Sequence, residues 1–164
     1  MPGSNAPRRR GASGQLPTLD RYLTYRLHML AKLSDRASHD LYLRECGLPL
    51  GEARCLACIG SFPSLTVNDL AFQANLDKGQ ASRAAASLVA QGLARKEASP
   101  LDGRSVVLSL TPAGRVRWSQ TMKLIDERNA AIFDCLTPDE RVLLGQLFDR
   151  LLEHARRAPD DQAT

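Results

Sequence analysis

The sequence predicts a mainly α-helical protein with one small β-hairpin, in the order α-α-α-α-β-β-α-α. Three observations support this fold class. Apolar residues recur at steps of three and four before Gly92, which is the period of an amphipathic helix. The period changes to two beyond Gly92, as expected for strands. Finally, Thr111-Pro112 and Thr137-Pro138 each precede another apolar helical pattern.

The composition is that of an ordinary globular protein. Hydrophobic residues make up 43% of the 164 residues and charged residues 24%, which argues against a fibrous or wholly disordered chain. A formal net charge of +4 permits an anionic partner without requiring one. Apolar runs are far shorter than the roughly 20 residues of a membrane helix, and the N-terminus has no apolar stretch typical of a secretory signal. We therefore expect a cytoplasmic protein that does not enter membranes.

The length favours a single domain with a tail at each end. Residues 1–17 and 158–164 have no hydrophobic periodicity, so we expect both to be disordered around a folded part, 18–157. The run Arg8-Arg9-Arg10 in the first tail has two interpretations. It is either a solubilising segment or an arm that enters a DNA minor groove.

Thr18 is predicted to cap a first helix that runs to about Cys46, where Gly47 and Pro49 stop it. The apolar residues of this helix fall into two groups. One group is Leu19, Leu23, Leu27, Leu30, Ala37 and Leu41, and the other is Tyr22, Tyr25, Met29, Leu33 and Leu43. The second group lies roughly 80 to 160° around the helix from the first. A helix that is apolar on two faces needs two partners, so we expect one to be its own domain and the other a second subunit.

Three shorter helices follow. They are predicted over about 50–61, 66–75 and 77–92. Thr66 caps the second of these helices, and Asn75 tolerates the left-handed backbone that a tight turn requires. Asp77 and Gln80 have the spacing of a capping box for the third helix. That helix is expected to bury Ala81, Ala84, Ala85 and Leu88.

Two strands and two helices complete the chain. Leu93–Ala98 and Ser105–Leu110 are predicted to form a hairpin in which Val106, Leu108 and Leu110 face the core, with Pro and Asp-Gly turn residues between the strands. One helix runs from Pro112 to about Cys135, and the next begins at a capping box formed by Thr137 and Glu140. The last helix carries Leu143, Leu144, Leu147, Phe148, Leu151 and Leu152. We expect another helix to cover this seam.

The segment 66–110 carries the strongest functional signal. Two short helices around a tight turn, with Ala71, Asn75 and Ala81 at the inner packing positions, fit a helix-turn-helix. The hairpin that follows directly adds a wing to this unit. An unspecialised pair of antiparallel helices is the alternative interpretation.

The candidate DNA contacts lie on the outer side of the second of these helices. They are Lys78, Gln80, Ser82, Arg83 and Ser87. We predict that Gln80 and Arg83 read bases, because Arg pairs with guanine and Gln with adenine in the major groove. At the hairpin tip, Arg104 can enter a narrow minor groove while Asp102 fixes its rotamer. The alternatives are solvated side chains on the helix and an ordinary ion pair in the turn.

At this spacing the motifs resemble those of the MarR family of winged-helix transcriptional regulators. The stretches that carry the resemblance are Thr66–Ala71, Ser82-Arg83, Leu88–Leu93, Asp102–Arg104 and Leu110–Arg115. The similarity covers about residues 20–155. Leu101 stands where the family usually has a further basic residue, which removes one phosphate contact.

The resemblance implies a homodimer that binds double-stranded DNA at a pseudo-palindromic operator. Dimerisation helices would comprise 18–46 and 111–157, and the winged helix-turn-helix about 50–110. Asp102 and Arg104 would take the family's role in the wing. Such regulators usually repress transcription and are released by a small molecule, often a phenolic or other aromatic acid, bound between the dimerisation helices and the winged lobe.

The candidate effector site is near the middle of the first helix. Its stripe becomes small and polar at Ser34, Ala37 and Ser38, which would leave volume near Arg54, a partner for a carboxylate. The alternative is that Ser34 and Ser38 only admit close helix packing. His39 is added to this set by family analogy alone, because helical geometry directs it away from the stripe.

No cofactor, metal site or catalytic residue is predicted. Cys55 and Cys58 have C-x-x-C spacing, but no second pair follows, so we interpret them as buried apolar residues and all four cysteines, with Cys46 and Cys135, as reduced thiols. We find no Ser-His-Asp order or Gly-rich phosphate loop, which argues against an enzyme. A regulator that responds to oxidation through cysteine thiols and a winged-helix module for protein interaction are the alternative functions.

Overall fold

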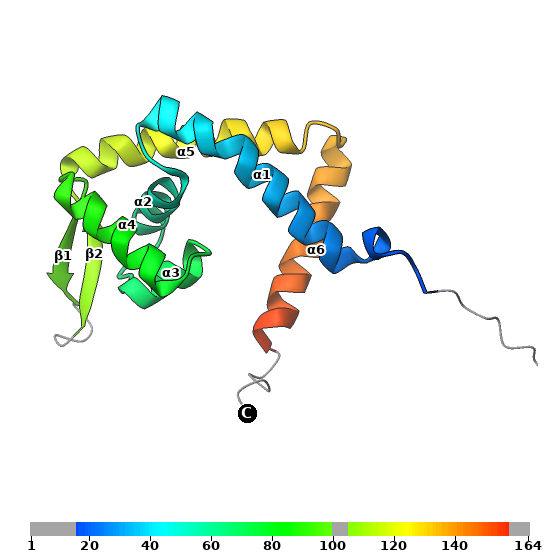
Figure 1. The fold of residues 1–164 in the computed structure, drawn as a ribbon, viewed down its shortest axis with the longest axis horizontal. Coiled ribbons are helices and arrows are strands. Elements are labelled where there is room, and N and C mark those ends of the chain that lie inside the picture. Colours follow the sequence, from blue (N-terminus) through cyan, green and yellow to red (C-terminus); the bar gives the residue numbers. More distant parts are fainter. Residues whose placement is uncertain (1–15, 100–104, 158–164) are drawn as a thin grey trace, which may run out of the picture.

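The computed structural model describes residues 16–99 and 105–157. Its elements are the 3₁₀ turn η1 (Leu19–Arg21), the helices α1 (Leu23–Cys46), α2 (Leu50–Ser61), α3 (Val67–Gln73) and α4 (Lys78–Ala90), the strands β1 (Ala94–Ala98) and β2 (Val106–Leu110), and the helices α5 (Pro112–Ile132) and α6 (Pro138–Arg157). Figure 1 displays this order, which confirms the predicted fold class. Apart from Leu16 and Pro17, which have no regular secondary structure, the predicted tails 1–17 and 158–164 lie outside the described residues.

Helices α2, α3 and α4 and the hairpin form a lobe with a continuous core (Figure 1). Leu56 on α2, Leu70 on α3 and Leu88 on α4 are fully buried, and burial of one such side chain contributes about 1.5–3 kcal/mol. The first half of α5 closes the lobe, where Trp118 Nε1 donates to the Ala57 carbonyl at 3.2 Å. The same core continues into Tyr42 and Cys46 at the end of α1 and Leu124 of α5.

Helix α1 begins later than the sequence predicts. Thr18 does not cap it, because the chain first makes η1 and the Thr18 hydroxyl bonds to the Asp20 carboxylate. The helix instead begins after Tyr22, without a side-chain cap. Its end is as predicted, since Gly47 adopts a φ of 64° and donates its N–H to the Leu43 carbonyl at 3.0 Å.

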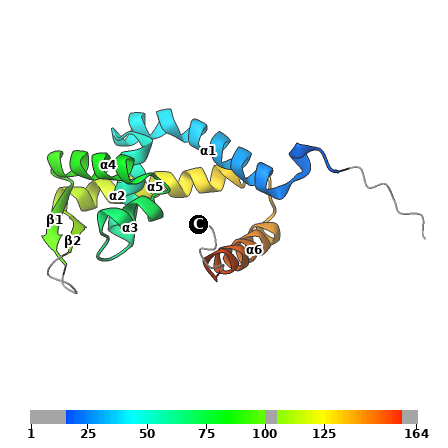
Figure 2. The same cartoon turned by 60° about the horizontal axis from the view of Figure 1, so that its bottom comes forward.

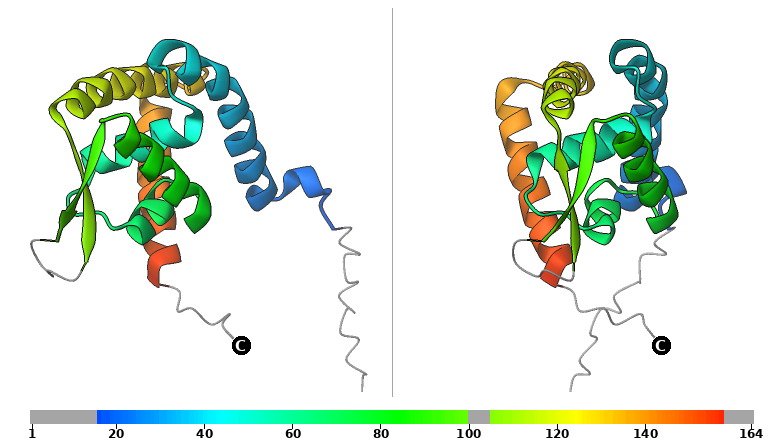
Figure 3. Two further views of the ribbon diagram at one scale, coloured as in Figure 1. Left: turned by 60° about the vertical axis from the view of Figure 1, so that its left-hand side comes forward. Right: turned by 90° about the vertical axis from the view of Figure 1, so that its left-hand side faces the viewer.

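The two strands pair antiparallel, from Ala94 opposite Leu110 to Ala98 opposite Val106. Leu108 and Leu110 are buried as predicted, but Val106 is 52% exposed and Val107 is buried. The prediction for Val106 was wrong because this residue pairs at the outer end of the hairpin, beyond the cover of the helices. Figure 3 shows the strands along one side of the lobe.

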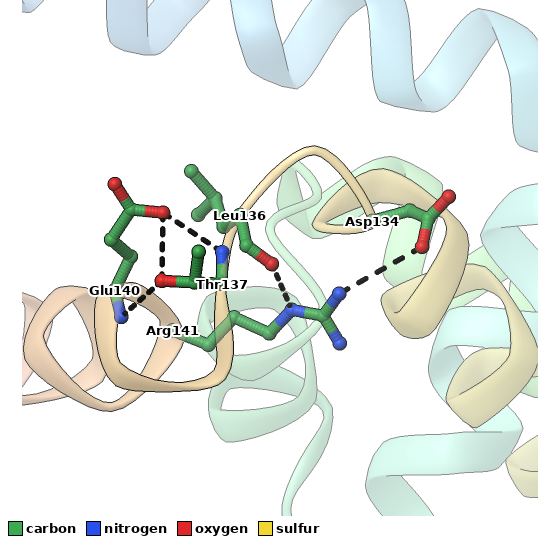
Figure 4. Close-up of polar contacts among 5 residues, drawn as sticks. All are labelled: Asp134, Leu136, Thr137, Glu140 and Arg141. Carbon is green, nitrogen blue, oxygen red and sulfur yellow. Dashed lines mark hydrogen bonds and ion pairs between the residues drawn. The ribbon is translucent and has the colours of Figure 1, made fainter.

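The turn between α5 and α6 contains the predicted capping box (Figure 4). A Glu140 carboxylate oxygen accepts from the Thr137 N–H at 2.8 Å, and the Thr137 hydroxyl accepts from the Glu140 N–H at 3.3 Å. The bond from the Thr137 N–H, with a second from the Thr137 hydroxyl at 3.0 Å, favours the ionised carboxylate and lowers the pKa of Glu140. Helix α5 ends at Ile132, three residues before the predicted Cys135, because the chain must turn before this box.

Arg141 fixes the same turn from the other side (Figure 4). Its Nε donates to the Leu136 carbonyl at 3.1 Å, and its Nη2 lies 3.8 Å from a carboxylate oxygen of Asp134. Bonds within the turn itself therefore hold the start of α6 relative to the end of α5.

Helix α6 stands apart from the lobe in Figures 1 and 2, and none of its residues is buried. Its exposed apolar side chains include Val142, Leu143, Leu147, Leu151 and Leu152. The N-terminal half of α1 is equally uncovered, with Leu23 79% exposed. A groove of about 620 Å³ is lined by Leu23, Leu147 and Leu151 among others.

Within residues 16–99 and 105–157, no helix combines the length and apolar content that a bilayer crossing requires.

Gly114 allows α5 to begin against the end of α4 and the start of β1. It is buried, and a Cβ at this position would overlap the Leu93 carbonyl oxygen. The Thr111 hydroxyl accepts from the Gly114 N–H at 2.9 Å and lies 2.6 Å from the Gly92 carbonyl oxygen, to which it donates. The glycine of the Leu-Thr-x-x-Gly-Arg stretch is thus required by a backbone contact.

We predict that Gly114→Ala destabilises the protein by about 1–3 kcal/mol or more, because the new methyl group forces two backbone segments apart. The matched control is Gly51→Ala on α2, where the added Cβ would make only an ordinary contact, 3.9 Å from Leu76 Cδ1. Alanine in that helix should stabilise by up to about 1 kcal/mol. Thermal unfolding followed by circular dichroism measures both. Equal melting temperatures for the two variants would contradict the close contact at Gly114.

Candidate nucleic-acid interface

Two capping boxes and a left-handed residue build the helix-turn-helix. The Thr66 hydroxyl accepts from the Asp69 N–H at 3.2 Å. The Asp69 carboxylate accepts from the Thr66 hydroxyl at 2.6 Å and from the Thr66 N–H at 3.0 Å, and these two bonds lower the pKa of Asp69. Asn75 adopts a φ of 52° and turns the chain between α3 and α4. Asn75 is exposed, so the inner packing position that the sequence assigned to it belongs to Ala74, which is buried with Ala71 and Ala81.

The N-terminus of α4 presents most of the predicted DNA contacts to solvent. Lys78, Gln80, Ser82 and Arg83 are exposed, whereas Ala81, Ala84, Ala85 and Leu88 are buried as predicted. The first N–H groups of a helix and its dipole also favour a negative charge at this end. The outer surface of α4 is therefore polar, with basic side chains near its start.

The side chains predicted to contact DNA differ in the hydrogen bonds and ion pairs that they make within the protein. Gln80 is engaged, because its Oε1 accepts from the Asp77 N–H at 3.2 Å in the capping box. Ser87 is half-buried and its hydroxyl accepts from Gln91 Nε2 at 3.0 Å. Arg83 makes no ion pair among the described residues, and its Nη1 lies over Gly79, 3.3 Å from where a Cβ would be. Arg83 is thus the better placed of the two predicted base readers.

The tip of the wing, with Asp102 and Arg104, lies outside the described residues. On β1, Arg95 Nε lies 2.5 Å from a Glu97 carboxylate oxygen and donates to the Ser109 hydroxyl at 3.1 Å. Lys96 beside it is exposed and has no ion pair within the described ranges. The strand therefore offers one neutralised and one free cation to a phosphate backbone.

Two of the four predicted effector residues have their polar groups engaged within the chain. The Ser38 hydroxyl donates to the Ser34 carbonyl at 2.7 Å, so Ser38 is satisfied within its own helix. His39 is exposed on the surface of α1. Arg54, the predicted partner of a ligand carboxylate, instead forms an ion pair with Asp35. Ser34 lines a groove of about 280 Å³ between α1 and α5.

Arg128 on α5 lines that groove and was missed by sequence analysis. Its Nε is buried and has no hydrogen-bond partner in the part of the chain that the structure describes. Tyr42 lies nearby: burial raises the pKa of its hydroxyl, and the positive charges of Arg128 and Arg54 oppose this rise. Nothing in the helical pattern distinguishes Arg128 from the exposed Arg115 of α5, so only packing identifies it.

Burial explains the chemistry of the cysteines. Cys46, Cys55 and Cys58 are buried and Cys135 is exposed in the turn before α6, and all four are free thiols. Burial raises the pKa of Cys55 to about 12, with smaller effects from Cys58 and Glu52, and burial also raises the pKa of Cys58. Over residues 16–99 and 105–157, no group of three or more His, Cys, Asp or Glu could hold a metal ion.

Comparisons with known proteins agree on one family. A sequence model described as the MarR family matches residues 47–105, whereas a search of curated proteins finds no match. A solved MarR family transcriptional regulator from Silicibacter pomeroyi is 25% identical, with a TM-score of 0.72, over 87% of this chain and 95% of that one. Apo wild-type MarR from E. coli is 25% identical, with a TM-score of 0.66, over 80% of this chain and 97% of that one.

A third solved structure was determined with a small molecule. It is a MarR family protein from Mycobacterium tuberculosis in complex with p-aminosalicylic acid. It is 22% identical, with a TM-score of 0.68, over 79% of this chain and 98% of that one, so this match concerns the fold.

We predict that one of the four thiols of the native protein reacts rapidly with an aromatic disulfide reagent at about pH 8. That thiol is Cys135, because Cys55 with a pKa of about 12 stays protonated and Cys46 and Cys58 are shielded. All four should react after denaturation. The Cys135→Ser variant is the control and should lose the rapid phase. Rapid reaction in that variant would contradict the burial of Cys46, Cys55 and Cys58.

Proposed function

The chain belongs to the MarR family of winged-helix transcriptional regulators, and on that premise we propose that it is a homodimeric repressor released by a small aromatic carboxylate. The family binds DNA and is not a family of enzymes. The observation that carries the proposal is the N-terminal face of α4, where exposed polar side chains surround an arginine without a partner among the described residues.

The dimer would form through α1 and α6. Both helices expose rows of leucine, and soluble monomers seldom leave such apolar surface in water. A second copy can cover both rows at once, because a two-fold axis brings the same surfaces together in each subunit. Two α4 helices would then enter successive major grooves, roughly 34–36 Å apart on one face of the duplex. Such a two-fold symmetric dimer would bind a pseudo-palindromic operator.

Base reading would centre on Arg83, and phosphate contacts on Lys78 and Ser82. Arg83 can make a bidentate pair with guanine without breaking an internal bond. Gln80 would first have to release the Asp77 N–H, so we assign it a smaller share of the discrimination than the sequence suggests. We retain Ser87 as a peripheral contact and Asp102 and Arg104 as the wing contacts.

The effector would bind in the groove between α1 and α5, with its carboxylate on Arg128. A buried guanidinium N–H without an acceptor is costly, and an anion would satisfy it. Leu30, Leu33 and Ile132 in the same groove would cover the aromatic ring. The M. tuberculosis relative that was solved with p-aminosalicylic acid supports this class of ligand. Of the residues named from sequence, Ser34 remains in the site, whereas Ser38, His39 and Arg54 would at most line its surroundings.

We predict that Arg83→Ala relaxes base preference at one position in each half-site, at a cost of about 1–3 kcal/mol. Lys78→Ala is the matched control on the same helix. It should weaken binding to all sequences alike and make the dependence on salt less steep. Fluorescence anisotropy with operator variants, selected from a random duplex library, measures both effects.

Two results would contradict this assignment. A uniform loss of affinity in Arg83→Ala would mean that Arg83 contacts phosphate and reads no base. A protein that is monomeric by light scattering and has no affinity for duplex DNA at low salt would overturn the proposed mode of action as a whole.

We predict that p-aminosalicylate raises the melting temperature of the wild-type protein, because a ligand that binds only the folded state stabilises it. Arg128→Gln should abolish the shift by removing the charge that holds the carboxylate. Lys123→Gln, an exposed position on the same helix, should leave the shift unchanged. An equal shift in all three proteins would exclude the Arg128 groove as the site.

A further inference from the structure

A second cleft lies on the other side of the lobe, where the wing joins α5. It has a volume of about 280 Å³ and is enclosed by the end of α2, the loop before α3, strand β2 and the first turns of α5. Its walls include the aromatic rings of Phe62 and Trp118, and Arg115 stands at its edge. Neither the DNA contacts nor the Arg128 groove uses any of these residues.

The aromatic wall of the cleft is rigid. The indole of Trp118 lies flat on α2 at Gly60, where a Cβ would overlap the ring, and its Nε1 is held by the Ala57 carbonyl. With its polar atom satisfied and one face packed, the ring offers only apolar surface to the cleft. Trp118 is half-buried and Phe62 is 44% exposed. A planar apolar group can therefore stack on this wall without moving it.

The loop that closes the cleft is fixed as well. Ser64 adopts a φ of 57°, a conformation that residues other than glycine seldom adopt and that is found more often at binding sites. Directly after it, the Leu65 carbonyl accepts from the Leu108 N–H at 2.9 Å and ties the loop to β2. The cleft is thus bounded by ordered backbone on both sides.

Charge decides what can occupy the cleft. Arg115 is exposed in the first turn of α5, where it lies one helical turn before Trp118, and makes no ion pair or side-chain hydrogen bond with the described residues. The positive end of the α5 dipole adds to its charge. The hydroxyls of Ser64 and Ser119 supply further polar groups at the lining. One cation beside a flat apolar wall favours a ligand with a ring and one negative group.

We propose that this cleft is a second ligand site, for a single-ring aromatic carboxylate that stacks on Trp118 and pairs with Arg115. A ligand there would touch Leu108 and Leu110, which belong to the strand that leads from the wing. The site is independent of the Arg128 groove, because ten residues of α5 separate positions 118 and 128, which corresponds to about 15 Å.

Trp118 is the single tryptophan of the chain, so a ligand that stacks on it acts directly on the protein's tryptophan emission. We expect benzoate to change the emission saturably, with a Kd of about 1 mM or lower. Benzamide lacks the charge and cyclohexanecarboxylate lacks the aromatic ring, so both should bind at least about tenfold more weakly. These three ligands test the chemistry of the cleft in the unaltered protein.

Variants separate the two sites. Arg115→Gln should weaken benzoate binding at least about tenfold, whereas Arg128→Gln and Lys123→Gln should bind as the wild type does. No saturable change up to about 10 mM benzoate, an equal response to benzamide, or an unaltered Kd in Arg115→Gln would overturn the proposal. Loss of the signal in Arg128→Gln instead would assign the benzoate to the other groove.

Discussion

The close backbone contact at the start of α5 is the constraint on which the rest of the structure depends. The Thr111 N–H donates to the Leu93 carbonyl at 3.1 Å, and Gly114 lets the first turn of α5 lie against the same carbonyl. Arg117 in the next turn bonds to the Cys46 carbonyl at the end of α1. The hairpin, α4 and α1 are therefore all attached to one helix.

The elements attached to α5 share a buried core, whereas α6 and the N-terminal half of α1 do not. The lobe has a core of small and medium side chains, as expected when only 5% of the residues are aromatic. Helix α6 and the N-terminal half of α1 have no comparable core and expose leucine rows. The free energy that orders these two helices against each other must come largely from outside the single chain. In the proposed dimer a second copy would provide it, and the position of the two lobes would then be set by how α1 and α6 pair.

The arginines fall into two groups, according to whether another group of the described chain accepts from or pairs with the guanidinium. Those that fix structure have partners: Arg54 pairs with Asp35, Arg95 with Glu97, and Arg141 with Leu136 and Asp134. Arg83, Arg115 and Arg128 have none among the described residues, and each lies at a surface or groove open to an anion. With a net charge of only +4, the protein cannot rely on a general attraction for DNA or for acids. These three arginines remain for the proposed binding of DNA and acids, because each is accessible and has no acceptor among the described residues.

Local chemistry determined most of the fold. The capping residues Thr66, Asp77 and Thr137, the left-handed Asn75 and the buried face of α4 act within a few residues of one another, so the sequence alone predicted them. The order of elements followed from these signals. Thr18 and Val106 were mistaken because a 3₁₀ turn and the outer end of the hairpin override the local pattern.

Only the tertiary structure decided which polar groups are free to bind. Sequence spacing could not reveal that Asp35 neutralises Arg54, that Gln80 caps its own helix, or that Arg128 is buried without an acceptor. The physical reason is that helical periodicity fixes the direction of a side chain, whereas its partner comes from another segment, as Asp35 and Arg54 come from α1 and α2. Whether a charge is satisfied is a property of the packed arrangement.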